Sequence, residues 1–138
     1  MPGQNIGHIL WTDLTVPDAD NVRAFYEAVI GWSSQPVEMA GRTDFSMVAP
    51  GDTPGKPAEH ANVVAGICNK VGELADFPSQ WLLYFGVADL GESLAACDRL
   101  GGKRLTKVIT MGASNFCVIE DPAGAVCGLF ESNPQDGN

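Results

Sequence analysis

The sequence predicts an α+β domain built from two βαβββ modules. A strand–helix–strand outline near the start of the chain returns some seventy residues later. Thirteen positions separate Asp18 from Gly31, and thirteen separate Asp89 from Gly102. Equal internal spacing is typical of a duplicated unit. Two segments show the apolar periodicity of a helix, and glycine and proline mark the ends of the predicted elements. This pattern favours four strands and one helix per module over a doubly wound fold.

The first module, at about residues 7–69, begins with an expected strand at 7–16. Asp18 or Asp20 can then cap a helix at 19–30. The apolar face expected for this helix carries Val22, Phe25, Tyr26 and Val29. The rest of the module is expected to hold strands at 32–39, 43–49 and 62–68, with a Pro- and Gly-rich loop at 50–61 as a candidate pocket cover.

The second module, at about residues 80–131, follows a connector at 69–80. Its expected elements are a strand at 81–88, a helix at 91–100 that carries Leu90, Leu94, Cys97 and Leu100, and strands at 103–110, 115–120 and 125–131. Both modules together form one expected domain over residues 1–138.

Side chains alternate between the two faces of a strand, so each first strand has a helix side and an opposite side. In the first module, Leu10, Leu14 and Val16 are expected to face the helix, and Trp11, Asp13 and Thr15 the concave side. In the second module, Leu83, Phe85 and Val87 are expected under the helix, and Leu82, Tyr84 and Gly86 on the concave side.

Composition narrows the range of partners and compartments. The formal charge of −9 and a pI near 4.4 disfavour binding to nucleic acid or to anionic membranes. The apolar runs are far shorter than the roughly 20 residues of a membrane span, and the start does not read as a signal peptide, so a cytoplasmic protein is expected.

The four cysteines show neither a CxxC pair nor zinc-finger spacing, and reduced thiols are expected. Cys117 and Cys127 flank a turn and are expected as near neighbours across a hairpin.

Three sets of motifs resemble one family. They are Trp11-Thr-Asp13-Leu with Phe25-Tyr26 and Gly31-Trp32, then Val87-Ala-Asp89 with Gly101-Gly102, and finally Asp121-Pro122-Ala-Gly124-Ala. Over about residues 7–131 the chain resembles the vicinal oxygen chelate superfamily, which includes glyoxalase I, extradiol dioxygenases, and fosfomycin and bleomycin resistance proteins. The resemblance implies a cupped, barrel-like mixed sheet with the helices outside, and a homodimer.

Members of that superfamily with metal chemistry hold a divalent ion in the cup, and the resemblance places its ligands at Trp11, Gly66, Leu82 and Gly128. None of these four side chains can donate an electron pair to a metal. His8 lies at the start of a strand with the opposite parity to Trp11, and His60 lies in the loop. Asp13, Cys68 and Glu131 would supply too few ligands. No metal and no cofactor are therefore expected.

A small-molecule pocket is expected on the concave side, because aromatic rings there surround a few polar groups and Gly66, Gly86 and Gly128 would leave volume free. The expected ligand-binding residues are Trp11, Asp13, Thr15, Cys68, Leu82, Tyr84, Val126, Gly128 and Phe130. Alternatively, the aromatic side chains fill the cup as core, and Asp13 bonds a neighbouring strand or the Tyr84 hydroxyl.

Three functions stay open at this point. The first is metal-free binding of a small, cationic or aromatic molecule by a glyoxalase/bleomycin-resistance-like protein. The second is a glyoxalase-type lyase or isomerase, with Asp13 or Cys68 as catalytic candidates. Relatives implied by the resemblance carry a histidine after Gly66-Ile67-Cys68, and Asn69 stands there instead, which disfavours a thiolate. The third is a dimeric interaction module without a small ligand.

Overall fold

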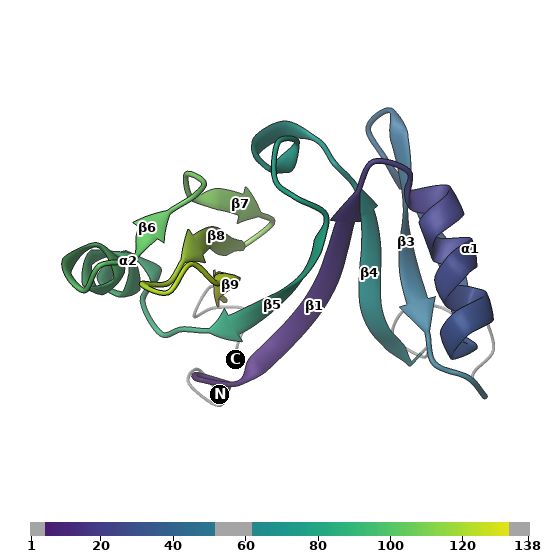
Figure 1. Cartoon of the computed structure of the whole chain (residues 1–138). Helices are drawn as coiled ribbons and strands as arrows, with labels where there is room; N and C mark the ends of the chain where they lie inside the picture. The colour runs from purple at the N-terminus through teal and green to yellow at the C-terminus, as the bar shows by residue number, and fades with distance from the viewer. Residues whose placement is uncertain (1–4, 52–61, 133–138) are drawn as a thin grey trace. The chain divides into compact units, whose positions relative to one another are not determined.

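Helices and strands of the chain fall into two compact units (Figure 1). The computed structural model describes residues 5–51 and 62–132. One unit is Thr12–Trp81, and the other combines Met1–Trp11 with Leu82–Asn138. The units follow the two predicted modules, except that the start of the first strand lies with the second module, and Gln80 and Trp81 lie with the first. The predicted loop at 50–61 falls almost wholly outside the described residues.

The unit Thr12–Trp81 has the predicted βαβββ order. Its elements are β1 (Ile9–Val16), α1 (Ala19–Ile30), β2 (Ser33–Met39), β3 (Arg42–Val48) and β4 (Val63–Asn69), followed by the short 3-10 helix η2 (Gly72–Leu74) in the predicted connector. The strand order is β2-β3-β4-β1, and β1 runs parallel to β4 while the other pairs are antiparallel. The α+β class and this module are therefore confirmed.

Helix α1 begins and ends as the sequence predicts. Asp18 is the cap, because its Oδ1 accepts the Asn21 N–H at 3.3 Å, whereas Asp20 pairs with Arg23. Gly31 ends the helix in the left-handed region at φ 90°, where a side chain would be strained. Figure 1 shows α1 running alongside β3.

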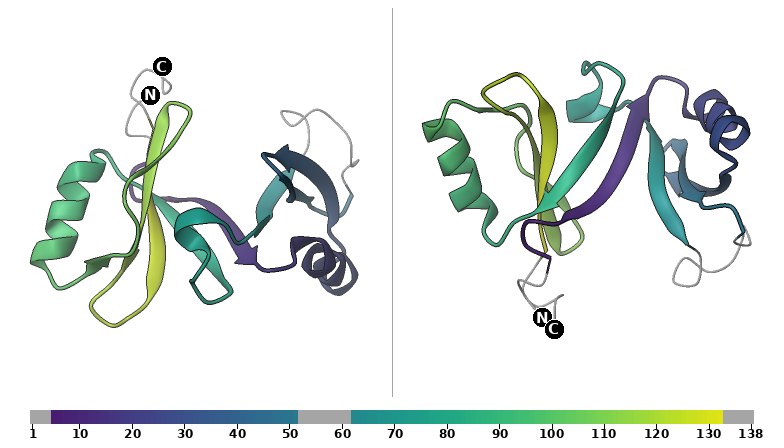
Figure 2. Two further views of the ribbon diagram at one scale, coloured as in Figure 1. Left: turned by 90° about the horizontal axis from the view of Figure 1, so that it is seen from above. Right: turned by 60° about the horizontal axis from the view of Figure 1, so that its bottom comes forward.

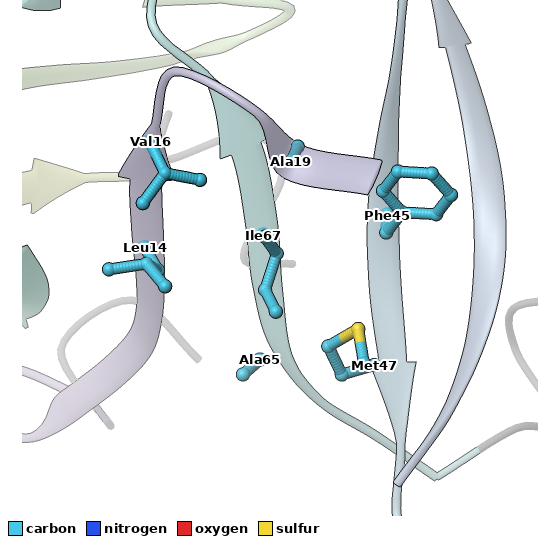
Figure 3. Packing of buried hydrophobic residues seen from close by; sticks show 7 residues of the cluster. All are labelled: Leu14, Val16, Ala19, Phe45, Met47, Ala65 and Ile67. Atoms are coloured by element: carbon cyan, nitrogen blue, oxygen red, sulfur yellow. The ribbon is translucent and has the colours of Figure 1, made fainter. Parts of the chain in front are cut away.

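The core of this unit lies between α1 and its strands. Figure 3 shows its buried residues, which are Leu14, Val16, Ala19, Phe45, Met47, Ala65 and Ile67. The predicted orientation of Leu14 and Val16 is thus confirmed. The predicted apolar face of the helix is half wrong: Val22 and Tyr26 pack against this core, but Phe25 and Val29 are 58% and 61% exposed. The buried stripe runs Ala19, Val22, Tyr26, a narrower line than the four apolar residues suggested.

The second unit holds most of β5 (Gln80–Gly86), from Leu82 onward, together with five further elements. These are α2 (Leu90–Arg99), β6 (Lys103–Arg104), β7 (Ile109–Met111), β8 (Ser114–Glu120) and β9 (Val126–Glu131). The strand order is β5-β9-β8-β6, with β7 also paired to β8, and β5 runs parallel to β9. Both views of Figure 2 show α2 to one side of these strands. In the described residues no helix is long and apolar enough to cross a membrane.

The predicted strand at 103–110 is wrong as one continuous element, because it is divided into β6 and β7. Buried Thr106 lies at the break, where its hydroxyl accepts the Val118 N–H at 3.1 Å and donates to the Lys107 carbonyl at 2.7 Å. A side chain that bonds the backbone in this way competes with the regular ladder between strands.

The core under α2 is smaller than the core of the first unit. Leu90, Leu94 and Cys117 are buried, with Val87, Ile119 and Leu129 packed against them. The predicted place of Val87 is confirmed, whereas Leu83, expected beside it, is 41% exposed. Cys117 and Cys127 lie on neighbouring strands but not opposite each other, because Cys127 pairs with Ile119 and Cys117 with Leu129. All four cysteines are free thiols.

Candidate functional site

Three predicted site residues come together on one face of the unit Thr12–Trp81. In the parallel pair β1 and β4, Asp13 lies opposite Gly66 and Thr15 opposite Cys68. Partners in a parallel ladder point to the same face, so Asp13, Thr15 and Cys68 share one side of the sheet. This is the side away from the Leu14 and Ile67 core. Asp13 and Cys68 are half-buried, and Thr15 is only 9% exposed.

The electrostatics of this polar face act most strongly on Cys68. Burial raises the pKa of the thiol to about 12, with smaller contributions from the carboxylates of Asp13 and Asp44, and the guanidinium of Arg42 opposes them. At neutral pH the group is therefore a neutral thiol and a weak nucleophile.

Asn69 connects β4 to α1 and to β3. It follows Cys68, at the position where relatives were expected to carry histidine. Its side-chain Oδ1 accepts the Ala19 N–H at the start of α1, and its Nδ2 donates to the Thr43 carbonyl at 2.8 Å and to the Asp44 carboxylate at 3.1 Å. An amide engaged in this way is a structural connector. It offers no base to activate Cys68.

Asp44 was missed by the sequence analysis. It is 6% exposed, pairs with Arg42 at 3.2 Å and accepts the backbone N–H of Asn69 at 3.0 Å. Because Phe45 and Met47 belong to the core, strand alternation places Asp44 on the same side as Asp13. The alternation of strand 43–49 was the signal that could have found it.

The other six predicted ligand-binding residues belong to the second unit, where aromatic side chains dominate. Tyr84 of β5 lies opposite Gly128 of β9, and Phe130 lies opposite both Gly86 and Phe116. Tyr84 and Phe116 meet edge to face with ring centroids 5.7 Å apart. Exposure varies: Leu82 and Tyr84 are buried, Val126 and Phe130 are half-buried, and Trp11 is 36% exposed.

The free volume predicted at two glycines is not there. A Cβ built on Gly128 would lie 2.5 Å from Cε2 of Tyr84, because the tyrosine ring covers this glycine. A Cβ on Gly86 would collide with the Asn5 carbonyl oxygen and would lie 3.0 Å from Leu10 Cδ1. Both glycines permit close packing of the chain against itself.

The residues at the metal positions implied by the superfamily do not fit a divalent ion. Trp11, Gly66, Leu82 and Gly128 offer no side-chain electron pair to a metal, and the Tyr84 ring covers Gly128. Across residues 5–51 and 62–132, no group of three or more His, Cys, Asp or Glu side chains is arranged to hold a metal. His8 is exposed, and His60 lies outside the described residues. A metal-free protein remains a prediction.

Comparison with known proteins places the chain among distant relatives. It is 28% identical over 130 residues to the protein named “Putative glyoxylase CFP32” of Mycobacterium bovis and of Mycobacterium tuberculosis. The alignment covers 94% of this chain and 46% of that protein, so the chain spans about half the length of these curated relatives.

Solved structures with the same fold include methylmalonyl-CoA epimerase from Mycobacterium tuberculosis, with TM-score 0.57, 17% identity, and coverage of 99% of this chain and 96% of that one. The Mn(II)-bound glyoxalase from Novosphingobium aromaticivorans has TM-score 0.55 and 17% identity over 94% of this chain and 40% of that one. At this identity the likeness shows the fold alone. Residues 11–130 match the model of the glyoxalase-like domain, which confirms the resemblance found in the motifs, and the chain belongs to that family.

Proposed function

We propose that the chain binds a small organic molecule without a divalent metal, and that Asp13 is the main polar contact. The observation that carries the proposal is the pairing of Asp13 and Thr15 with Gly66 and Cys68. It puts a carboxylate, a hydroxyl and a neutral thiol on the face of the sheet away from the core. A half-buried carboxylate in such a setting favours a cationic or hydroxyl-bearing ligand.

The aromatic residues of the second unit stay in the proposal as predicted contacts to be tested singly. Trp11 and Phe130 are the more accessible of these rings, whereas Tyr84 is largely engaged with Gly128 and Phe116. Trp11 is therefore the first aromatic residue to substitute.

A lyase or isomerase of glyoxalase type is the second candidate function. The names of the relatives and of the structures with this fold support it. Of the two catalytic candidates, the structure favours Asp13, because a thiol with a pKa of about 12 supplies almost no thiolate at neutral pH. Asp13 would then act as an acid or base on the bound molecule.

A homodimer is the proposed assembly. Strand β2 is at one end of its strand order, and it carries Val37 and Met39 at 38% and 40% exposure. Open sheet edges favour association with another chain. Relatives about twice as long as this chain are consistent with pairing of two such domains. Sedimentation should give about twice the chain mass of 14.6 kDa, and a monomer at high concentration would contradict the assembly.

The binding proposal is tested by screening EDTA-treated protein in thermal-shift assays against cationic and hydroxyl-bearing metabolites, then by measuring affinities calorimetrically. Asp13→Asn should weaken a cationic ligand by about tenfold or more, the cost of one charge-assisted contact. Asp76→Asn is the control, since Asp76 is an exposed carboxylate of the same unit. Equal affinities for all three proteins, or binding only after a divalent metal is restored, would reject the proposal.

A further inference from the structure

An open hollow lies in the unit Thr12–Trp81, near the start of α1. Its volume is about 440 Å³, and it is lined by Asp18, Asp20, Arg42, Thr43, Phe45 and Asn69. The volume falls within the ~300–1,000 Å³ of ligand pockets, and the hollow is open to solvent. Phe45 belongs to the core under α1, whereas Arg42 pairs with Asp44 on the face that holds Asp13, so this hollow adjoins that face without including Asp13.

Two of the lining residues are held in place by their own hydrogen bonds. Asn69 bonds Ala19, Thr43 and Asp44 through its side chain. The Thr43 hydroxyl donates to the Glu38 carboxylate at 3.1 Å. These two residues form a preorganised wall, so a ligand would meet a surface that needs little rearrangement.

Arg42 offers an unused donor pair to the hollow. Its Nε donates to both oxygens of Asp44, at 3.3 and 3.2 Å, which fixes the guanidinium. Within the described residues no acceptor is recorded for its two terminal nitrogens, and the side chain is 26% exposed. A planar guanidinium fixed through Nε presents these nitrogens in the fork that binds a carboxylate.

Asp18 supplies the opposite charge. Its carboxylate accepts the Asn21 N–H and the Asn21 side-chain amide at 2.6 Å, and among the described residues no cationic side chain pairs with it. Asp20, by contrast, is neutralised by Arg23 at 2.6 Å. The hollow therefore combines one carboxylate without a counter-charge and one guanidinium with free donors. A simple anion would be repelled by the acidic side, and a simple cation would leave the Arg42 donors unused.

We propose that this hollow binds a small zwitterion with an ammonium and a carboxylate group, the charge pattern of a free amino acid. The ammonium lies at Asp18, and the carboxylate meets the terminal nitrogens of Arg42. The side chain of the ligand lies toward Phe45, whose ring also contacts the Arg23 guanidinium at 5.2 Å. The site uses none of Asp13, Thr15 and Cys68, although Arg42 pairs with Asp44 on their face of the sheet.

The test uses three probes: phenylalanine, phenylalanine amide, which lacks the carboxylate, and N-acetylphenylalanine, which lacks the ammonium. Calorimetry should show phenylalanine binding about tenfold more tightly than either blocked probe, because each loses one charge-assisted contact. Backbone amide signals of Asn21, Thr43 and Asn69 should shift in NMR spectra as phenylalanine is added. Equal affinities, shifts confined to other residues, or no phenylalanine binding with Kd below about 10 mM would overturn the proposal.

Two substitutions assign the ends of the ligand without removing the fold. Arg42→Lys keeps a positive charge beside Asp44 but loses the fork, so it should weaken phenylalanine about tenfold and leave the amide unchanged. Asp18→Asn keeps a good helix cap but loses the charge, so it should weaken phenylalanine and the amide alike and leave the acetylated probe unchanged. Arg104→Lys, in an ion pair with Asp98 in the other unit, is the matched control. A variant that weakens all three probes equally, or none, would contradict the assignment.

Discussion

Equivalent positions in the two modules carry different types of side chain, with different structural roles. Asp13 and Tyr84 both lie five residues before the Asp that caps the following helix, and each faces a glycine on the parallel neighbouring strand, Gly66 or Gly128. In the first module this position carries a half-buried carboxylate beside Thr15 and Cys68. In the second, a buried aromatic ring covers the glycine. The same backbone arrangement therefore supplies a polar face in one unit and an aromatic layer in the other.

The helix ends make a second comparison. Gly31 ends α1 in the left-handed region, but its spacing equivalent Gly102 does not have this role, because the preceding Gly101 does so at φ 96°. Gly102 instead allows close approach: a Cβ there would lie 2.6 Å from the Cys97 sulfur and 2.9 Å from the Glu120 carbonyl oxygen. The equal spacing from Asp18 to Gly31 and from Asp89 to Gly102 thus predicted both turns, but it could not predict the structural role of each glycine.

Removal of the aromatic ring should have the largest effect on stability. We expect Tyr84→Ala to lower the free energy of unfolding by about 3–5 kcal/mol, because a buried ring packed on Gly128 and Phe116 is lost. Urea denaturation measures the change. Trp11→Ala, at a ring 36% exposed, should cost clearly less. Equal losses would mean that Tyr84 contributes no more packing than an accessible ring.

A side chain at Gly128 should be the next most costly change. We expect Gly128→Ala to destabilise by about 1–3 kcal/mol, because the added methyl group overlaps the Tyr84 ring. Combining it with Tyr84→Ala should make the glycine substitution far less costly, since the overlap is gone. Additive losses in this double-mutant cycle would show that the two residues are not coupled.

The thiol of Cys68 should make stability fall at alkaline pH. Its pKa is raised from 9.0 to about 12, so the stability it contributes is complete below pH 9.0 and is lost as the pH rises toward 12. By pH 10 the loss should be on the order of 1.4 kcal/mol, one unit of pH beyond the unfolded value. Chemical denaturation at pH 8 and 10 should show a smaller decline in Cys68→Ala than in the unaltered chain. An identical decline would place Cys68 in a more solvated setting.

Loss of either helix cap should have the smallest effect, and a similar one in both modules. We expect Asp18→Ala and Asp89→Ala each to cost about 1 kcal/mol, because each carboxylate accepts one N–H of the first turn, from Asn21 or Glu92. Thermal unfolding with Asp76→Asn as the exposed control measures this. A loss confined to one variant would show that the two helix starts are not energetically equivalent.

The helices and strands could be predicted because residues close in sequence determine where they begin and which face they bury. Asp18 and Asp89 mark helix starts through their own side-chain bonds, and the alternation around Leu14 and Val16 follows from strand geometry. The division of strand 103–110 could not be predicted, because it depends on a hydrogen bond that the Val118 N–H donates to the Thr106 hydroxyl, twelve residues away.

The candidate site was less predictable for the same reason. A glycine in a strand leaves the space of a side chain free, and the sequence does not show which group occupies that space. At Gly128 the space is occupied by the Tyr84 ring, and at Gly86 by the carbonyl oxygen of Asn5. By contrast, the alternation of side chains along each strand was enough to predict that Asp13, Thr15 and Cys68 share one face. The register of β1 and β4 brings these residues side by side. The hollow near Asp18 is built from two separate strands and a helix start, which no single motif records.

The hydrogen bond from Ala19 to Asn69 has a kinetic consequence. The first free N–H of α1 is satisfied from fifty residues away, by a side chain at the end of β4. Local capping by Asp18 can start the helix early, but its first turn is complete only after a long loop has closed and β4 has docked. Asn69→Ala should therefore speed unfolding more than it slows folding, and α1 and the end of β4 should exchange their amide hydrogens as one cooperative unit.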